Sequence, residues 1–249
     1  MNDIEKLSYV MTIGNGKYER SNLAFDFFAM LAIRISNACD PVHLEARKNK
    51  LIRIMAKYTH EELIAFEEYI SLLIDILQRN LSAWDLEDTL GRMYEKYGKL
   101  SSSQELTPKG IANLMSKIVI CPETQVANKG YVTVTDPTCG SGGTFLATAQ
   151  RMMELGHNPV TQMVVLANDV NPRAVHMAYI QASFYGIPAV ITQADILTLD
   201  EVARWYTPAY ILGNWIWRAP LTHTSERNAS DEMLKRVSRC RNPMIVPLL

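Results

Sequence analysis

Four apolar stretches in the second half of the chain each end on an aspartate or an asparagine, and these residues are Asp136, Asp169, Asp195 and Asn214. Carboxylate and amide oxygens accept hydrogen bonds from hydroxyl and amino groups. Asp and Asn are also common in turns, so the alternative is that they only cap the ends of strands. Four such ends in succession favour a single site that accepts hydrogen bonds from a polar ligand.

A glycine-rich turn, DPTCGSGG, follows the first of these stretches at residues 136–143. Glycine has no side chain, so such a turn lets the backbone approach a ligand closely. The turn lacks the Gly-Lys-Ser/Thr of a phosphate loop and the Gly-x-Gly-x-x-Gly of a dinucleotide site. An acid at the second strand end, Asp169, can take the two hydroxyls of a ribose, and Asp195 can accept from an adenine amino group. A ligand with ribose and adenine but no required phosphate is S-adenosylmethionine, which is therefore the expected cofactor.

The elements that must position these residues alternate from residue 107 onward. The pattern predicts strands at 131–136, 162–169, 189–195 and 209–214, and helices at 109–120, 144–156, 172–186 and near 199–205. Alternating strands and helices predict a parallel sheet of the Rossmann-like α/β class, whose ligands bind beyond the carboxyl ends of the strands. The 32 residues after Trp217 have room for one helix at 230–240 and one strand at 244–249, which gives about five strands.

The first hundred residues are expected to form an α-helical region, so the chain divides into residues 1–100 and 101–249. Asp40-Pro41 is a typical helix start. Thr59 with Glu62 forms a capping-box pattern ahead of apolar residues at helical spacing. We interpret these apolar stripes as core packing. The polar, Ser-rich segment at 98–106 is the expected joint between the two regions.

Composition narrows the possible partners. The net charge is −1, so nucleic-acid contact must be local. The region 218–249 carries six Lys/Arg against three acids and is a candidate for that contact, although a solvated surface is the alternative. The four cysteines are far apart, with no metal-site spacing, which is typical of free thiols in a reducing cytoplasm. Neither a signal peptide nor a membrane span is indicated, so we expect a cytoplasmic protein without a membrane partner.

The segment DPTCGSGGTFL resembles the Asp-Pro-x-x-Gly-Ser/Thr-Gly-Gly signature of N6-adenine DNA methyltransferases of the type I restriction-modification kind. Upstream, QELTPKGIANLM is similar to their Phe/Tyr-Thr-Pro segment, and DTLGRMYEKYG is similar to the helix that leads into it. NDVNPRAVHMAYIQASFYGI and QADIL resemble the acidic motifs of the next two strands. The resemblance covers roughly residues 84–217 and implies a Rossmann-like fold that binds S-adenosylmethionine.

The resemblance also implies which residues bind the cofactor. Thr107 and Pro108 would line its methionine side, although a simple helix start is the alternative for this pair. Asp136 and the turn would face its carboxylate, amine and sulfonium, Asp169 its ribose and Asp195 its adenine. The full cofactor-binding set expected from the resemblance is Leu106, Thr107, Pro108, Asp136, Thr138, Cys139, Gly140, Gly142, Thr144, Asp169 and Asp195.

The catalytic motif of the family is Asn-Pro-Pro-Phe/Tyr, and the corresponding residues here are Asn214-Trp215-Ile216-Trp217. In that motif the Asn oxygen and a main-chain carbonyl accept both hydrogens of the adenine amine, and the aromatic residue stacks on the flipped base. Asn214 and Trp217 are therefore the expected catalytic residues. Both prolines are absent, so the alternative is that the tryptophans pack in an inactive pocket.

The leading hypothesis is therefore an S-adenosylmethionine-dependent DNA adenine-N6 methyltransferase with DNA as its partner. Because the region after Trp217 is too short for a target-recognition domain, sequence choice would need a separate specificity subunit or be absent. The second hypothesis is a catalytically inactive methyltransferase-like module that binds cofactor, DNA or a restriction subunit. A third, weaker one is a methyltransferase that acts on RNA, protein or a small molecule.

Overall fold

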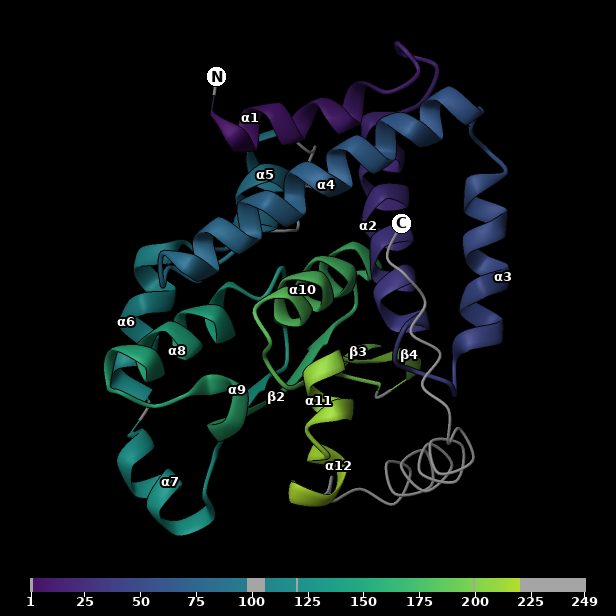
Figure 1. Ribbon diagram of the computed structural model, residues 1–249. Helices are drawn as coiled ribbons and strands as arrows, with labels where there is room; N and C mark the ends of the chain where they lie inside the picture. Colours follow the sequence, from purple (N-terminus) through teal and green to yellow (C-terminus); the bar gives the residue numbers. More distant parts are fainter. Residues whose placement is uncertain (1, 98–105, 120, 199, 220–249) are drawn as a thin grey trace.

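The computed structural model describes residues 2–97, 106–119, 121–198 and 200–219 (Figure 1). Its centre is a mixed four-stranded sheet in the order β1-β2-β3-β4. The strands are β1 (Val132–Asp136), β2 (Met163–Asp169), β3 (Ala189–Ala194) and β4 (Glu201–Tyr206). β1, β2 and β3 run parallel, and β4 runs antiparallel to β3. The parallel part confirms the expected α/β class.

Helices account for most of the remaining described chain. Those before the sheet are α1 (Asp3–Ser8), the 3-10 helix η1 (Tyr9–Thr12), α2 (Arg20–Asn37), α3 (Leu44–Met55), α4 (His60–Ser82), α5 (Thr89–Tyr97), α6 (Lys109–Val119) and α7 (Pro122–Lys129). Those between and after the strands are α8 (Gly143–Glu154), α9 (Pro159–Gln162), α10 (Pro172–Phe184), α11 (Pro208–Leu212) and α12 (Trp215–Arg218). None of the helices in the described part of the chain combines the length and apolar character that a bilayer span needs.

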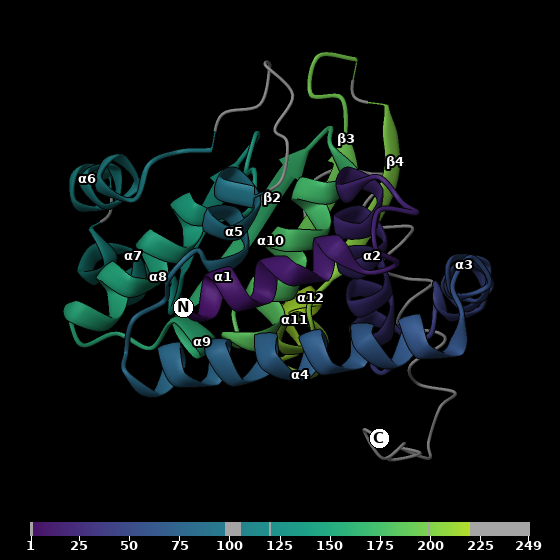
Figure 2. The same ribbon diagram turned by 90° about the horizontal axis from the view of Figure 1, so that it is seen from above.

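One face of the sheet carries the main core. α8 packs against β1, α10 packs against β2 and β3, and α2 packs on α10 (Figures 1 and 2). Side chains alternate between the two faces of a strand, so Val165 and Ile191 point into this core whereas Val164 and Val190 point to the other face. The second face carries a smaller cluster under α11 and α12. The sheet is therefore the middle of three layers, with the thicker helical layer on one side.

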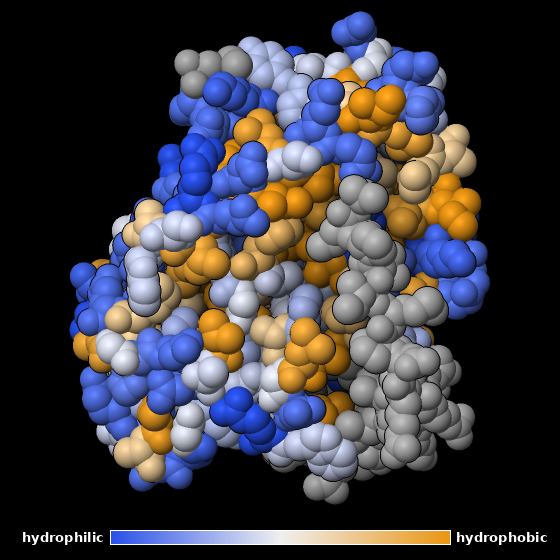
Figure 3. Space-filling model, viewed as in Figure 1, coloured by the Kyte–Doolittle hydropathy of each residue, from blue (hydrophilic) through white to orange (hydrophobic). Residues whose placement is uncertain are grey.

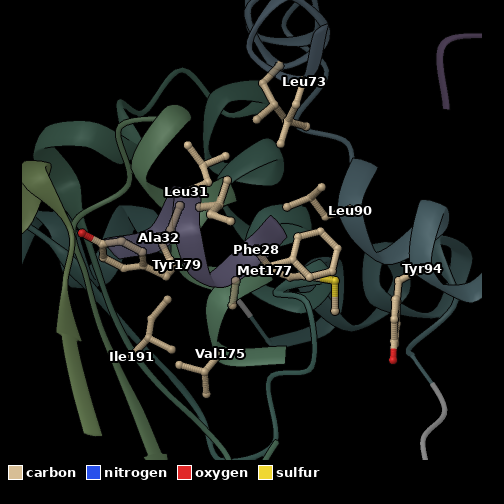
Figure 4. Packing of buried hydrophobic residues seen from close by; sticks show 14 of the residues in the cluster. Phe28, Leu31, Ala32, Leu73, Leu90, Tyr94, Val175, Met177, Tyr179 and Ile191 are labelled. Carbon is tan, nitrogen blue, oxygen red and sulfur yellow. The ribbon is translucent and has the colours of Figure 1, made fainter. Parts of the chain in front are cut away.

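The helical N-terminal region shares the main core with the sheet. Phe28 from α2, Leu90 from α5 and Met177 from α10 belong to one buried cluster (Figure 4). The expected capping box of Thr59 and Glu62 starts α4 and is confirmed. On the face seen in Figure 3, polar and charged residues surround smaller apolar areas. The division at residue 100 stays a prediction, and the joint at 98–105 lies outside the described residues.

The expected order of elements is wrong at residues 199–214. The segment expected as a short helix forms β4, and the segment expected as the strand 209–214 forms α11. Thr207 explains the second difference, because its side chain accepts a hydrogen bond from the Tyr210 N–H and Pro208 occupies the first turn. These are strong helix-start signals, so the apolar run that follows belongs to a helix. The helix and strand expected at 230–240 and 244–249 lie outside the described residues.

Candidate cofactor site

The carboxyl ends of the three parallel strands bring three of the predicted acids to one edge of the sheet. Asp136 ends β1, Asp169 ends β2, and Asp195 directly follows β3. Within the sheet, Asp136 is aligned with Ala167 and Asp169 with Gln193, so neighbouring strands end close to one another. Parallel sheets bind ligands beyond this edge. The geometry therefore gathers the acids where a ligand would meet all of them.

The glycine-rich turn after β1 folds back over the end of β2. The Cys139 N–H donates to the Asn168 carbonyl at 2.8 Å, and the Gly140 N–H donates to Asp169 Oδ2 at 2.9 Å. Gly142 has a φ of +100°, and a Cβ there would lie 2.3 Å from the Phe145 ring. An L side chain is therefore strained in conformation and blocked in space at this position. Glycine is therefore favoured here by its conformation and by the Phe145 ring, whereas the close approach of a ligand to the turn stays a prediction.

Asp136 and Asp169 hold the turn without using up their accepting capacity. Asp136 accepts from the Thr138 N–H and from the Thr144 hydroxyl. Asp169 accepts from the Gly140 N–H and, at 2.8 Å, from the Asn171 N–H. Each ionised carboxylate has about four lone-pair positions, so sites remain for further donors. The two hydroxyls of a ribose are donors of the required kind.

Asp195 and Cys139 differ in what they offer a ligand. Asp195 Oδ1 accepts from the Leu197 N–H at 2.8 Å, and among the described residues no donor reaches its second oxygen, which can accept from a ligand amino group. The Cys139 side chain is buried. Burial, reinforced by the charges of Asp169 and Asp136, raises the pKa of the Cys139 thiol well above its usual value. Cys139 therefore contributes backbone geometry to the turn and keeps an inert thiol.

The segment before α6 reaches the same turn. A Cβ added to Gly140 would meet Leu106 Cδ2 at 3.0 Å, so Leu106 already packs on the turn. A small cleft of about 20 Å³ between the two is lined by Leu106, Thr107, Thr138 and Thr144 among others. A larger cavity of about 260 Å³ adjoins it between α5, α6 and α8, where Pro108 is also part of the lining. The structure thus brings Leu106 and Thr107 to the glycine-rich turn, and Thr107 also lines a groove together with Asp136. Binding of the cofactor by the Thr-Pro segment stays a prediction.

Asp88 joins this site although it was not predicted from the sequence. Its carboxylate accepts from the Ser141 hydroxyl at 2.5 Å, from Gln181 Nε2 at 2.8 Å and from the Gly91 N–H at 2.9 Å. Gln181 also donates to the Ser141 carbonyl at 2.9 Å. Asp88 therefore connects the start of α5, the turn and α10. The signal that was available is its place at the start of DTLGRMYEKYG, the segment that resembles the helix leading into the Thr-Pro segment of the family.

Asn214 and Trp217 lie at the opposite edge of the sheet. Because β4 runs antiparallel to β3, it returns the chain to the amino end, where the Thr207 hydroxyl donates to the Ile187 carbonyl just before β3. The prediction that Asn214 ends a parallel strand beside the three acids is therefore wrong. A strand rises about 3.3 Å per residue, so the length of β2 puts roughly 20 Å between the two edges.

Short helices fix this placement. Asn214 has a φ of +54° and precedes α12. Trp215 is fully buried against the edge of the Tyr131 ring, with 5.4 Å between ring centroids. The Arg218 guanidinium lies over the Trp215 ring and donates to the Thr161 carbonyl at 2.8 Å. Trp215 is thus a packing residue, as one alternative held, but it packs under the sheet and not in the cofactor site. Trp217 is 67% exposed.

The arrangement at the carboxyl edge can bind a nucleoside through acceptors for hydroxyl and amino groups and through a closely approaching backbone turn. This donor and acceptor pattern fits S-adenosylmethionine. Among the residues that the structure describes, no group of three or more His, Cys, Asp or Glu side chains is placed to hold a metal ion.

Comparisons with known proteins bear on the family and not on the individual site residues. A family model described as N-6 DNA Methylase matches residues 85–242. A crystal structure of a candidate class I S-adenosylmethionine-dependent methyltransferase from Listeria monocytogenes is similar to this chain at a TM-score of 0.45 and 12% identity, over 94% of this chain and 79% of that one. No curated protein matches the sequence.

Proposed function

This chain belongs to the N-6 DNA methylase family, and from that premise we propose that it transfers the methyl group of S-adenosylmethionine to the N6 amine of adenine in DNA. S-adenosylmethionine is the cofactor, as in the family as a whole. DNA as the substrate and adenine N6 as the acceptor are the finer part of the proposal. DNA contact and a separate specificity or restriction subunit are the proposed partners.

The observation that supports cofactor binding is the meeting of three carboxylates and the glycine-rich turn at one edge of the sheet. We assign the ribose hydroxyls to Asp169 and the adenine amino group to Asp195. The methionine end faces Asp136 and the turn, with Thr107 beside it. The hydrogen bond from the Gly140 N–H orients the Asp169 carboxylate for ribose binding, because it fixes that carboxylate relative to the turn. The bound cofactor supplies the electrophilic methyl group.

Transfer to adenine requires an acceptor for the amine hydrogens near that methyl group. In the family motif this is the Asn side chain, and here Asn214 lies at the other edge of the sheet. For Asn214 to reach the cofactor, α11 and α12 must leave their place and expose Trp215. Removing a buried tryptophan from its packing costs about 3–5 kcal/mol in typical cores. Such a rearrangement occurs only if the free energy of DNA binding offsets this cost.

The position of Asn214 therefore favours a second candidate function. In it, the chain binds S-adenosylmethionine and acts as a catalytically inactive, regulatory module associated with restriction-modification. The two candidates share the cofactor site and differ only in whether a methyl group is transferred. They are separable because Asn214 and Trp217 lie far from every residue that we assign to the cofactor.

The test measures cofactor binding and transfer separately on the purified chain. Calorimetry with S-adenosylmethionine should show binding that Asp169→Ala abolishes and Asn214→Ala leaves unchanged. Incubation with tritiated cofactor and adenine-containing DNA then decides between the candidates, with RNA and DNA lacking adenine as controls. Labelled DNA that is lost in Asn214→Ala establishes transfer through this residue.

Binding without labelling of any nucleic acid, beside an active family member, establishes the regulatory candidate. Label that persists in Asn214→Ala assigns the acceptor to another residue. Absence of cofactor binding in the unaltered, folded chain contradicts both candidates.

A further inference from the structure

β2 carries an asparagine next to its last residue, which is an uncommon residue for the interior of a strand. This residue is Asn168, directly before Asp169. Strands are depleted in asparagine, because the residues that suit a pleated surface are β-branched and aromatic ones. Side chains alternate between the two faces of a strand, so Asn168 shares a face with Val164 and Leu166 and lies on the opposite face from Asp169. A half-buried amide at this position needs hydrogen-bond partners.

The Asn168 side chain finds its partners at the ends of both neighbouring strands. Its Nδ2 donates to the Pro137 carbonyl at 3.2 Å on one side and to the Ala194 carbonyl at 3.0 Å on the other. The main-chain carbonyl of Asn168 also accepts from the Cys139 N–H at 2.8 Å. An amide group has two N–H donors, and two carbonyls accept from this one, so the orientation of the side chain is fixed. One residue of β2 is therefore bonded to the glycine-rich turn after β1 and to the end of β3.

The regular pairing of the sheet ends one residue before the carbonyls that Asn168 contacts. The last aligned pair of β1 and β2 contains Asp136, and the last aligned pair of β2 and β3 contains Gln193. The residue after Asp136 is a proline, which has no N–H to continue the ladder. The residue after Gln193 is at an irregularity in the pairing of β3 with β4. Beyond the ladder, the Asn168 side chain joins the two outer strand ends across β2.

The two strand ends that Asn168 joins are those assigned to opposite ends of the cofactor. Pro137 follows Asp136 in the turn that we assign to the methionine end, and Ala194 precedes Asp195, which we assign to the adenine. β1 and β3 are not neighbours, because β2 lies between them. With neighbouring strands about 4.8 Å apart, these two strand ends are roughly 10 Å apart. Their separation is therefore set through β2.

We propose that Asn168 is a positioning residue for the cofactor, because it fixes the distance between the glycine-rich turn and Asp195. The inference rests on the proposed cofactor site and is independent of methyl transfer. A ligand that is bound at both ends gains effective concentration for its second end, and this gain is largest when the spacing of the two subsites matches the ligand. Asn168 contributes to the gain from joining the two ends and not to the affinity of either end alone.

Separate probes for the two ends of the cofactor test the inference on the full-length chain. 5′-Methylthioadenosine carries the adenine and the ribose, and L-methionine carries the carboxylate and the amine. Asn168→Ala should weaken the binding of S-adenosylmethionine about tenfold in calorimetry, which is part of the roughly 10²–10⁴-fold gain that joining two ends gives. Each probe, titrated and followed by NMR, should bind Asn168→Ala within about twofold of its affinity for the unaltered chain. Asp195→Ala should instead weaken 5′-methylthioadenosine together with S-adenosylmethionine.

Two further variants complete the test. Asn168→Leu fills a similar space without donors or charge, so it should reproduce the loss if Asn168→Ala does not fold. Thr192→Ala is the matched control, because Thr192 is aligned with Asn168 on β3, is also half-buried, and joins no strand ends through its side chain in the described part of the chain. It should bind all three ligands like the unaltered chain.

Equal affinity of Asn168→Ala and Thr192→Ala for S-adenosylmethionine overturns the inference. A loss that either probe shares to the same extent also overturns it, because Asn168 would then shape only one subsite. Absence of S-adenosylmethionine binding in the folded, unaltered chain overturns the cofactor site itself and this inference with it.

Discussion

Replacing Asp88 by alanine should loosen the glycine-rich turn, because one carboxylate holds groups from three segments of the chain. The contacts come from the Ser141 hydroxyl at 2.5 Å, Gln181 Nε2 at 2.8 Å and the Gly91 N–H at 2.9 Å. Hydrogen bonds to a charged group contribute about 1.5–3 kcal/mol each, and a buried donor left unpaired costs a similar amount. Not every contact loses its full hydrogen-bond energy in Asp88→Ala, so the sum of the three overestimates the loss in the free energy of unfolding.

Gln181 Nε2 keeps a second partner in the Ser141 carbonyl, whereas Gly91 is buried although its hydrogen bond to Asp88 is only partly buried. Ser141 is 1% exposed as a residue, and its hydroxyl loses its acceptor outright. We therefore expect Asp88→Ala to lower the free energy of unfolding by about 2–3 kcal/mol, and to weaken cofactor binding because Ser141 lies in the turn. The free energy of unfolding of Asp88→Asn should lie between those of Asp88→Ala and the unaltered chain. Its amide oxygen still accepts from the Ser141 hydroxyl, but its NH2 group faces another donor, the Gln181 amide.

The measurement is urea unfolding followed by tryptophan fluorescence, paired with calorimetry of S-adenosylmethionine. Asp85→Ala is the control in the same loop. Its carboxylate makes an exposed ion pair with Lys109 at 3.4 Å, and removing such a pair changes the stability by no more than about 0.5 kcal/mol. If the two alanine variants unfold within about 0.5 kcal/mol of each other, Asp88 does not anchor the turn.

Three further outcomes follow from burial and charge. Burial, together with the charges of Lys50 and Arg47, lowers the pKa of His176 to about 3. Below pH 6.5 the unfolded chain therefore binds more protons than the folded chain, so the free energy of unfolding falls as the pH falls. Between pH 6 and 4.5, urea titrations should show this fall to be steeper by about 1.4 kcal/mol per pH unit in the unaltered chain than in His176→Phe. Trp215→Ala should lower it by about 3–5 kcal/mol in the same assay, while exposed Trp217→Ala stays within about 0.5 kcal/mol of the unaltered chain; equal effects would contradict the placement of α12. Asp195→Ala should weaken cofactor binding about tenfold in calorimetry, the value of one hydrogen bond, with little change in unfolding.

The sequence predicted the parallel strands and the turn because both depend on local patterns. β-branched residues in 131–136 favour a strand regardless of distant contacts. A turn with Gly140 and Gly142 at positive φ has few alternatives to glycine, so its residues reveal its conformation. Asp88 has no such pattern. Its side-chain partners lie 53 and 93 positions further along the chain, and only the folded structure brings them together.

The failure at 199–214 has a different cause. Val202 and Trp205 are three apart, as on a helix face, and AYILG is a short apolar run that is ambiguous between strand and helix. One non-local fact and one local signal determined the outcome. The edge of β3 was available to pair with Glu201–Tyr206, and Thr207 with Pro208 supplied a helix start immediately afterwards. The error then moved Asn214 from one edge of the sheet to the other, so the catalytic assignment depended on a single local choice.

The position of α12 decides whether Asn214 can take part in methyl transfer, because transfer through Asn214 needs α12 to leave Tyr131. Trp215→Phe removes part of the packing on Tyr131 and should loosen α12 without unfolding the sheet. If this packing is what keeps Asn214 from the cofactor, DNA labelling should rise in Trp215→Phe and the rise should be lost when Asn214→Ala is added. Labelling that stays at the level of the unaltered chain, in a variant whose unfolding shows the sheet intact, would contradict a restraining role for α12.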